Sequence, residues 1–103
     1  MSTPLSDIGC VKAATRILGD KWTPILLRCI ANTESVRFCQ LQDNADGINP
    51  RTLSARLVTL ETDGIIEKNP LSSSARAEYR LTKKGSDLLP ILTAMQAWGE
   101  RYR

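Results

Sequence analysis

The segment from Ile48 to Gly64 constrains the fold more than any other, because its residues define a helix with clear ends. Asn49 suits the N-cap, and Pro50 suits the first helical position, where no backbone donor is needed. Gly64 supplies the left-handed residue that commonly ends a helix. Leucines recur at helical spacing, namely Leu53, Leu57 and Leu60. We therefore expect a helix over residues 50–63 with one apolar face turned toward a core.

The opposite face of this helix is narrow, polar and basic. A face of this kind, with an arginine near the helix N-terminus, can enter the major groove of DNA. An ordinary amphipathic helix with a solvated face is the competing interpretation. On the first interpretation, the candidate DNA-binding residues of the segment are Asn49, Arg51, Thr52, Ser54, Ala55 and Arg56.

Each of these side chains has its own expected role. Arg51 is the best candidate for a bidentate pair with guanine. Thr52 and Ser54 either contact a base edge or phosphate, or are simply exposed to solvent. Ala55 can pack against a thymine methyl group. Arg56 lies toward the buried side, so an ion pair with an acidic neighbour and a phosphate contact are both open.

Composition limits the class of protein. The chain has 103 residues, 42% of them hydrophobic and 24% charged, which fits a single domain over residues 1–103. Its net charge is +3, and residues 49–84, with seven basic and four acidic side chains, hold the whole excess. A local positive excess attracts phosphate. No apolar run approaches the roughly 18 residues of a membrane span and no signal peptide is visible, so we expect a cytoplasmic protein.

The residues of catalysis and metal binding are sparse. Without histidine, the chain lacks the commonest general base and the usual Ser/His or Cys/His pairs. Three widely spaced cysteines, Cys10, Cys29 and Cys39, favour neither a disulfide framework nor structural zinc. We therefore expect no enzyme activity, no metal and no cofactor.

Periodicity and turn residues predict a mainly helical chain with one small β-hairpin. The segment 36–38 is either a short strand or the start of the helix that follows it. Helices are expected at about 8–18, 21–31, 38–43, 50–63 and 83–102, and strands at 65–68 and 77–81. Residues 38–63 then form a helix-turn-helix unit, and residues 65–81 form a wing behind it. Within the wing, Arg76 is a candidate for a phosphate or minor-groove contact.

The last predicted helix carries a broad apolar stripe that a domain of this size has little core left to cover. Such a stripe marks an interface, although packing on the domain's own core is the alternative. We expect residues 8–18 and 83–103 to form dimerisation helices, with Pro90 bending the second. The assigned interface residues are Leu88, Leu92, Met95, Trp98 and Tyr102.

Cys10 is either a reactive sensor or an inert small hydrophobic residue. A thiol becomes reactive where a helix N-terminus or a nearby cation lowers its pKa. Cys10 lies near the expected start of the first helix, and Lys12 is close by. Cys29 and Cys39 fall at core-like positions and are expected to be structural.

Several motifs, in this order, resemble the HxlR-type winged helix-turn-helix transcriptional regulators of bacteria and archaea. They are an isolated Cys10, Gly19-Asp20-Lys21-Trp22, Gly47-Ile48-Asn49-Pro50-Arg51, Asp63-Gly64-Ile65-Ile66, Glu78-Tyr79-Arg80-Leu81-Thr82 and Trp98-Gly99. The resemblance covers nearly the whole chain. It implies a homodimer whose terminal helices pack together, with the fourth helix in the major groove and the hairpin near the DNA backbone. It also implies that Cys10 senses oxidants or electrophiles.

The chain departs from the family pattern in two places. Its wing segment, Leu71-Ser72-Ser73-Ser74-Ala75, lacks the prolines and bulky residues common there, and Ala55 and Val58 stand where relatives often carry charge. The sequence as a whole predicts a sequence-specific DNA-binding transcriptional regulator that acts as a homodimer on a pseudo-palindromic operator. A small-molecule-responsive regulator with a pocket beside Trp22 and Trp98, and a protein-interaction module without DNA binding, are the alternatives.

Overall fold

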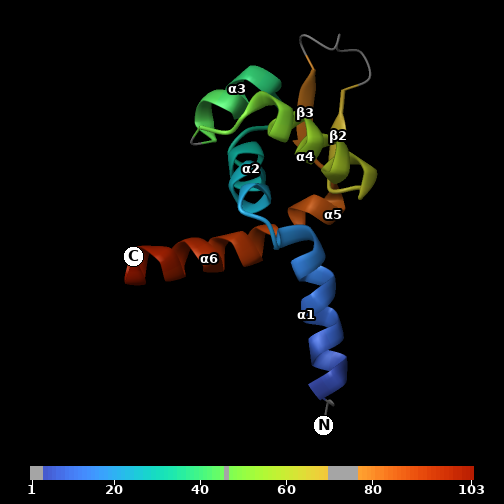
Figure 1. Ribbon diagram of the computed structural model, residues 1–103, viewed down its shortest axis with the longest axis vertical. Coiled ribbons are helices and arrows are strands. Elements are labelled where there is room, and N and C mark those ends of the chain that lie inside the picture. The colour runs from blue at the N-terminus through green and yellow to red at the C-terminus, as the bar shows by residue number, and fades with distance from the viewer. Residues whose placement is uncertain (1–3, 46, 70–76) are drawn as a thin grey trace.

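The computed structural model describes residues 4–45, 47–69 and 77–103. Its elements run, in chain order, α1 (Pro4–Leu18), α2 (Trp22–Ala31), β1 (Val36–Arg37), α3 (Phe38–Asn44), α4 (Pro50–Thr62), β2 (Ile66–Lys68), β3 (Glu78–Leu81), α5 (Lys83–Ser86) and α6 (Leu89–Tyr102). Figure 1 shows α2, α3, α4 and the sheet as one body from which α1 and α6 project in different directions. The predicted mainly helical fold with a small sheet is confirmed.

The predicted hairpin gains a third strand. β2 and β3 pair antiparallel, with Ile66 opposite Leu81 and Lys68 opposite Tyr79. β1 pairs antiparallel with the other edge of β3, so that the sheet order is β1-β3-β2. Within the segment 36–38, Val36 and Arg37 therefore form a two-residue strand, and Phe38 begins α3. A helix-turn-helix followed by a hairpin that closes on a short first strand is the winged helix-turn-helix fold.

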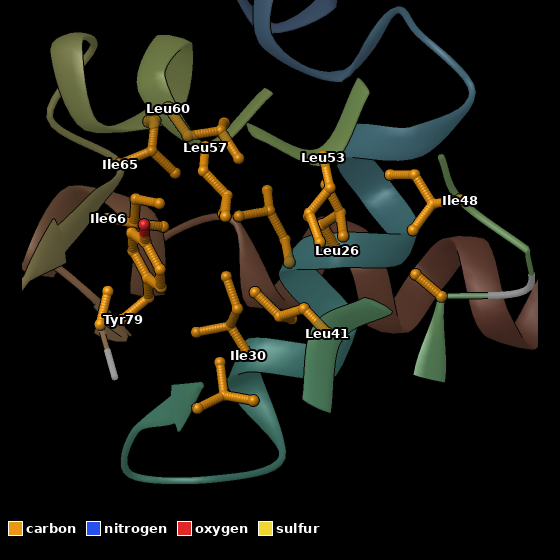
Figure 2. Close-up of a cluster of buried hydrophobic side chains, with 14 of the residues drawn as sticks. Leu26, Ile30, Leu41, Ile48, Leu53, Leu57, Leu60, Ile65, Ile66 and Tyr79 are labelled. Atoms are coloured by element: carbon orange, nitrogen blue, oxygen red, sulfur yellow. The ribbon is translucent and has the colours of Figure 1, made fainter. Parts of the chain in front are cut away.

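The hydrophobic core lies between α2, the paired helices α3 and α4, and the inner face of the sheet (Figure 2). Side chains from α2 and α4 supply its centre, and Ile65 and Ile66 close it at the start of β2. The predicted apolar face of α4 is confirmed, because its three leucines are buried: Leu53, Leu57 and Leu60. Burial of this face fixes which side of α4 is turned outward.

Both ends of α4 form as the sequence predicts. The Asn49 side chain oxygen accepts a hydrogen bond of 2.8 Å from the Arg51 backbone N–H. At the other end Gly64 adopts a φ of 75°, the left-handed conformation that stops the helix. The Lys84 Nζ donates to the Asp63 carbonyl oxygen at 2.8 Å, which satisfies one of the free carbonyls at this end. The helix is thus held at both ends by identifiable contacts.

The expected final helix is instead two helices, so the predicted bend at Pro90 is wrong. Thr82 caps α5, as its side chain oxygen accepts from the Gly85 backbone N–H. The chain leaves α5 at Asp87, and α6 begins at Leu89 with Pro90 in its first turn. A proline costs no hydrogen bond there, because the first N–H groups of a helix have no partner within it. Gly85 also packs against the Ile65 carbonyl, where a Cβ atom would collide.

The two projecting helices expose apolar side chains. α1 starts at Pro4, one turn earlier than expected, and exposes Ile8 and Val11. α6 exposes four large apolar or aromatic side chains, namely Ile91, Met95, Trp98 and Tyr102. Within the described residues, no helix is both long enough and apolar enough to cross a membrane.

Candidate nucleic-acid interface

The outward face of α4 carries the residues that the sequence assigned to DNA contact. Arg51, Ser54 and Ala55 are exposed, whereas Thr52 and Arg56 are half-buried at its flanks. The helix presents this face because the opposite side is anchored by its three buried leucines. The structure therefore brings Arg51, Ser54 and Ala55 onto one surface, with Thr52 and Arg56 at its edges.

The electrostatics of this face favour an anionic partner. In the part of the chain that the structure describes, the Arg51 guanidinium makes no ion pair or hydrogen bond with another side chain. No acidic residue lies between Pro50 and Leu60, so nothing on these three turns repels a phosphate. The positive end of the helix dipole lies beside Arg51. Asn49 is exposed, and its side chain oxygen is occupied as the helix cap.

Arg56 is held by an acidic residue of another element. Its Nε lies 3.5 Å from the Asp20 Oδ1, and this buried nitrogen has no hydrogen-bond partner within the described residues. Of the two roles left open for Arg56, the structure therefore shows the ion pair, with Asp20 as the acidic partner. It ties α4 to the start of α2.

Asp20 is a site residue that the sequence reasoning missed. Its Oδ1 accepts from the backbone N–H groups of Trp22 and Thr23, at 2.8 and 2.9 Å, so it caps α2. Burial by itself raises the pKa of Asp20, but the hydrogen bonds from Thr23 and Trp22 and the Arg56 charge outweigh it and hold this pKa below 3.8. An aspartate just ahead of an apolar-periodic segment is an ordinary N-cap signal, and it could have identified this residue.

The wing offers less free charge than its sequence suggests. Arg80 Nε lies 2.6 Å from Glu67 Oε1, and Arg37 Nε lies 3.8 Å from Glu78 Oε1. Both pairs join neighbouring strands of the sheet, so these guanidinium groups are already partnered. The predicted contact by Arg76 lies outside the described residues.

The cysteines differ from two expectations. Cys10 is exposed, but it lies in the middle of α1 rather than near its start, so the helix N-terminus does not act on the thiol. Cys39 is exposed at the start of α3, and its predicted core position is wrong. Cys29 is half-buried against the core, as predicted, and burial raises the pKa of its thiol, an effect that the Arg28 charge opposes.

The predicted interface stripe on α6 divides into two parts. Leu92 is only 4% exposed and Leu88 is half-buried, so both pack on the core of their own domain. Trp98 and Tyr102 are exposed, and their ring centroids lie 5.2 Å apart. Met95, also assigned to the interface, is exposed as well. Ile91 is exposed too, although the sequence reasoning did not assign it to the interface. On a helical wheel Met95, Trp98 and Tyr102 lie to the opposite side of Leu88 from Leu92, and this signal could have separated the two sets.

A groove of about 400 Å³ lies between α2 and α6. Its wall is mostly apolar, and its polar groups come from both helices. It is lined by Pro24, Ile25, Arg28, Cys29, Asn32, Leu92, Met95 and Gln96. Neither Trp22 nor Trp98 lines it, and the pocket expected beside these two residues at the dimer helices stays a prediction. Among the described residues, no cluster of histidine, cysteine or acidic side chains could hold a metal ion.

Fold and surface together define a winged helix-turn-helix transcriptional regulator. A family model described as HxlR-like helix-turn-helix matches residues 17–103. The chain belongs to the HxlR-like helix-turn-helix family, as its motifs predict. Members and relatives of this family are transcriptional regulators rather than enzymes.

Three similar proteins support this assignment. The HTH-type transcriptional regulator YdeP of Bacillus subtilis, itself uncharacterised, is 34% identical over 97 residues, which cover 92% of this chain and 75% of YdeP. The oxidised form of the redox regulator HypR matches with a TM-score of 0.82 and 32% identity, covering 90% of this chain and 96% of HypR. Diamide-treated YodB from B. subtilis matches with a TM-score of 0.71 and 26% identity, covering 99% and 96% of the two chains.

Proposed function

We propose that the protein is a sequence-specific DNA-binding regulator that places α4 in the major groove. The observation that carries this proposal is the outward face of α4, where Arg51 is exposed and unpaired among the described residues and no acidic side chain precedes Glu61. Arg51 pairs with a guanine, and Ser54 and Ala55 contact neighbouring positions. Thr52 and the N-terminus of α4 face a phosphate. Such a regulator works in the cytoplasm, where the prokaryotic chromosome lies.

A homodimer presents two such helices to one operator. The exposed apolar side chains of α6 and α1 supply a surface whose exposure to water is unfavourable, so that burial between two protomers stabilises a dimer. Met95, Trp98 and Tyr102 are the thioether and aromatic side chains of this surface. Two-fold symmetry then matches a pseudo-palindromic operator with half-sites about one helical turn, roughly 34–36 Å, apart.

A thiol switch at Cys10 would couple DNA binding to oxidants or electrophiles. Cys10 is exposed on α1, the helix that also exposes Ile8 and Val11, so a modification there would change a helix of the proposed dimer surface. HypR, solved in an oxidised form, is a redox regulator of the same fold, and YodB has been solved after diamide treatment.

Selection of bound fragments from sheared genomic DNA, with and without an oxidant, tests the proposal and yields the operator. We expect enrichment of one palindromic site and a linear fall of log affinity with log salt, with a slope of about −0.9 for each phosphate neutralised. Absence of DNA binding at low salt would overturn the DNA-binding proposal and favour an interaction module.

The groove between α2 and α6 supports a second candidate, a regulator that responds to a small molecule. Its apolar wall fits the body of a ligand, and Arg28, Asn32 and Gln96 offer polar groups at its rim. The Arg28 Nε already donates to the Gln96 side chain oxygen at 3.0 Å, which links the two helices across this groove. A ligand that separates this pair would shift α6 and hence the dimer.

A further inference from the structure

Val58 is an apolar side chain placed where the proposed function needs a base contact. It is 62% exposed on α4. A single exposed valine is ordinary on a protein surface, so its exposure alone indicates nothing. What distinguishes it is its position, because Arg51, Ala55 and Val58 follow one another at spacings of four and three residues along one helix face.

On the side of Val58 toward Arg51 the neighbouring residues carry no charge, since Ser54 and Ala55 precede it by one turn. The Thr59 hydroxyl is turned back into the helix, where its Oγ1 donates to the Ala55 carbonyl at 3.1 Å. It is therefore not free to donate to a base. The first carboxylate along the helix is that of Glu61. Between Arg51 and Val58, this face thus offers, apart from the Arg51 and Ser54 side chains, the methyl groups of Ala55 and Val58.

The spacing along the helix sets where Val58 would meet DNA. At 1.5 Å per residue, seven residues place it roughly 10 Å beyond Arg51 along the helix axis. That distance corresponds to about three base-pair steps of roughly 3.4 Å. In the major groove only thymine presents a methyl group, whereas the other bases present polar atoms that a valine would desolvate without pairing.

We propose that Val58 contacts a thymine 5-methyl group and so specifies a thymine about three base pairs from the guanine that Arg51 contacts. This inference rests on the proposed function, because it assumes that α4 lies in the major groove. It adds a specificity residue that lies deeper along the helix than the first-turn contacts and uses apolar packing instead of hydrogen bonds.

Replacing single thymines of the selected operator by deoxyuridine tests the contact, because this change removes only the 5-methyl group. We expect one particular thymine of the half-site to be sensitive. Its replacement in one half-site should lower the affinity about four-fold, and its replacement in both half-sites roughly fifteen-fold. The Val58→Ala variant should bind the thymine operator more weakly by a similar factor and should no longer distinguish deoxyuridine. Alanine at an exposed helical position leaves the fold intact.

The control variant is Thr59→Ala, a change on the same helix about 100° around the axis from Val58, which should keep the full sensitivity to deoxyuridine. Three results would overturn the inference while leaving DNA binding in place: an operator without thymine at that distance, a parent indifferent to deoxyuridine at every thymine, or a Val58→Ala variant as sensitive as the parent. A parent that binds no DNA at low salt would instead overturn the proposed function and the inference with it.

Discussion

Arg56 Nε lies 3.5 Å from Asp20 Oδ1, and this ion pair joins the middle of α4 to the N-terminal cap of α2. The same carboxylate accepts hydrogen bonds from the Trp22 and Thr23 backbone N–H groups. Since α2 supplies the centre of the core, Asp20 connects the core to the helix proposed to enter DNA. These contacts explain the aspartate of the Gly19-Asp20-Lys21-Trp22 motif noted in the sequence.

The ionisation of Asp20 should make stability depend on pH. Its pKa in the folded protein lies below the ordinary 3.8, so the stabilisation is fully present above that value and is lost as the pH falls through the folded pKa. We expect the difference in free energy of unfolding between the parent and Asp20→Asn to be constant from pH 7 to about pH 5 and to shrink below pH 3.8. Urea denaturation across this range measures it. A difference that grows on acidification would contradict the assignment.

Removing the Arg56 charge should affect the fold and DNA binding only slightly. The Arg56 side chain is 39% exposed, and exposed ion pairs contribute about 0–1 kcal/mol. We expect Arg56→Met to lower the free energy of unfolding by less than about 1 kcal/mol and to leave the salt dependence of operator binding unchanged. A slope reduced by about 0.9 per half-site would show that Arg56 neutralises a phosphate instead.

The sequence predicts best where local chemistry decides the structure. Asn49, Pro50 and Gly64 act within a few residues of the helix ends that they define, and both ends of α4 form as expected. The division between α5 and α6 was missed because Thr82 is a helix cap and the apolar stripe begins only at Leu88, so the sequence pattern assigns the polar residues 83–87 to the first turn of the same helix. Pro90 is compatible with a bend or with a helix start, and in the structure it stands in the first turn of α6, while Gly85 of α5 packs on the Ile65 carbonyl.

The candidate site was predicted in part for the same reason. The outward face of α4 follows from helical periodicity, whereas the partner of Arg56 lies 36 positions earlier in the chain and is reached only through tertiary packing. The exposure of Cys39 and the burial of Leu92 likewise depend on which elements cover them. Residue type alone favoured the opposite outcome for Cys39.

Arg51 should determine both affinity and base preference. A bidentate pair with guanine contributes about 1–3 kcal/mol, so Arg51→Ala should weaken operator binding by about 5- to 150-fold for each half-site. Arg51→Lys is the matched control, because it keeps the charge but loses the planar pair of donors. We expect the lysine variant to retain the salt dependence and to lose the preference for guanine in a gel-shift titration with base-substituted operators. Equal operator binding by Arg51→Ala and the parent would refute this role.

Two positions on α6 separate dimerisation from folding. Trp98 is 67% exposed, so Trp98→Glu should give a folded monomer in analytical ultracentrifugation with little change in its helical content. Leu92→Ala, at a position that is 4% exposed, should instead lower the free energy of unfolding by about 2–5 kcal/mol, because it leaves a cavity in the core. A Trp98→Glu variant that remains dimeric would remove α6 from the proposed interface.

The three thiols should differ in reactivity for reasons of exposure and pKa. Cys29 is half-buried, and its pKa is raised by burial, so it should be alkylated slowest by iodoacetamide in the native protein, as mass mapping can measure. Cys10 should be alkylated fastest, as a sensor thiol requires, but exposed Cys39 can react as well, so the rates alone do not identify the switch. The decisive comparison is operator binding after oxidant treatment. We expect Cys10→Ser to keep binding DNA under conditions that release the parent, Cys29→Ser and Cys39→Ser. If Cys10→Ser is released like the parent, or if Cys10 is alkylated slowest, the switch does not depend on this thiol, and the exposed position of Cys10 on α1 has no regulatory role.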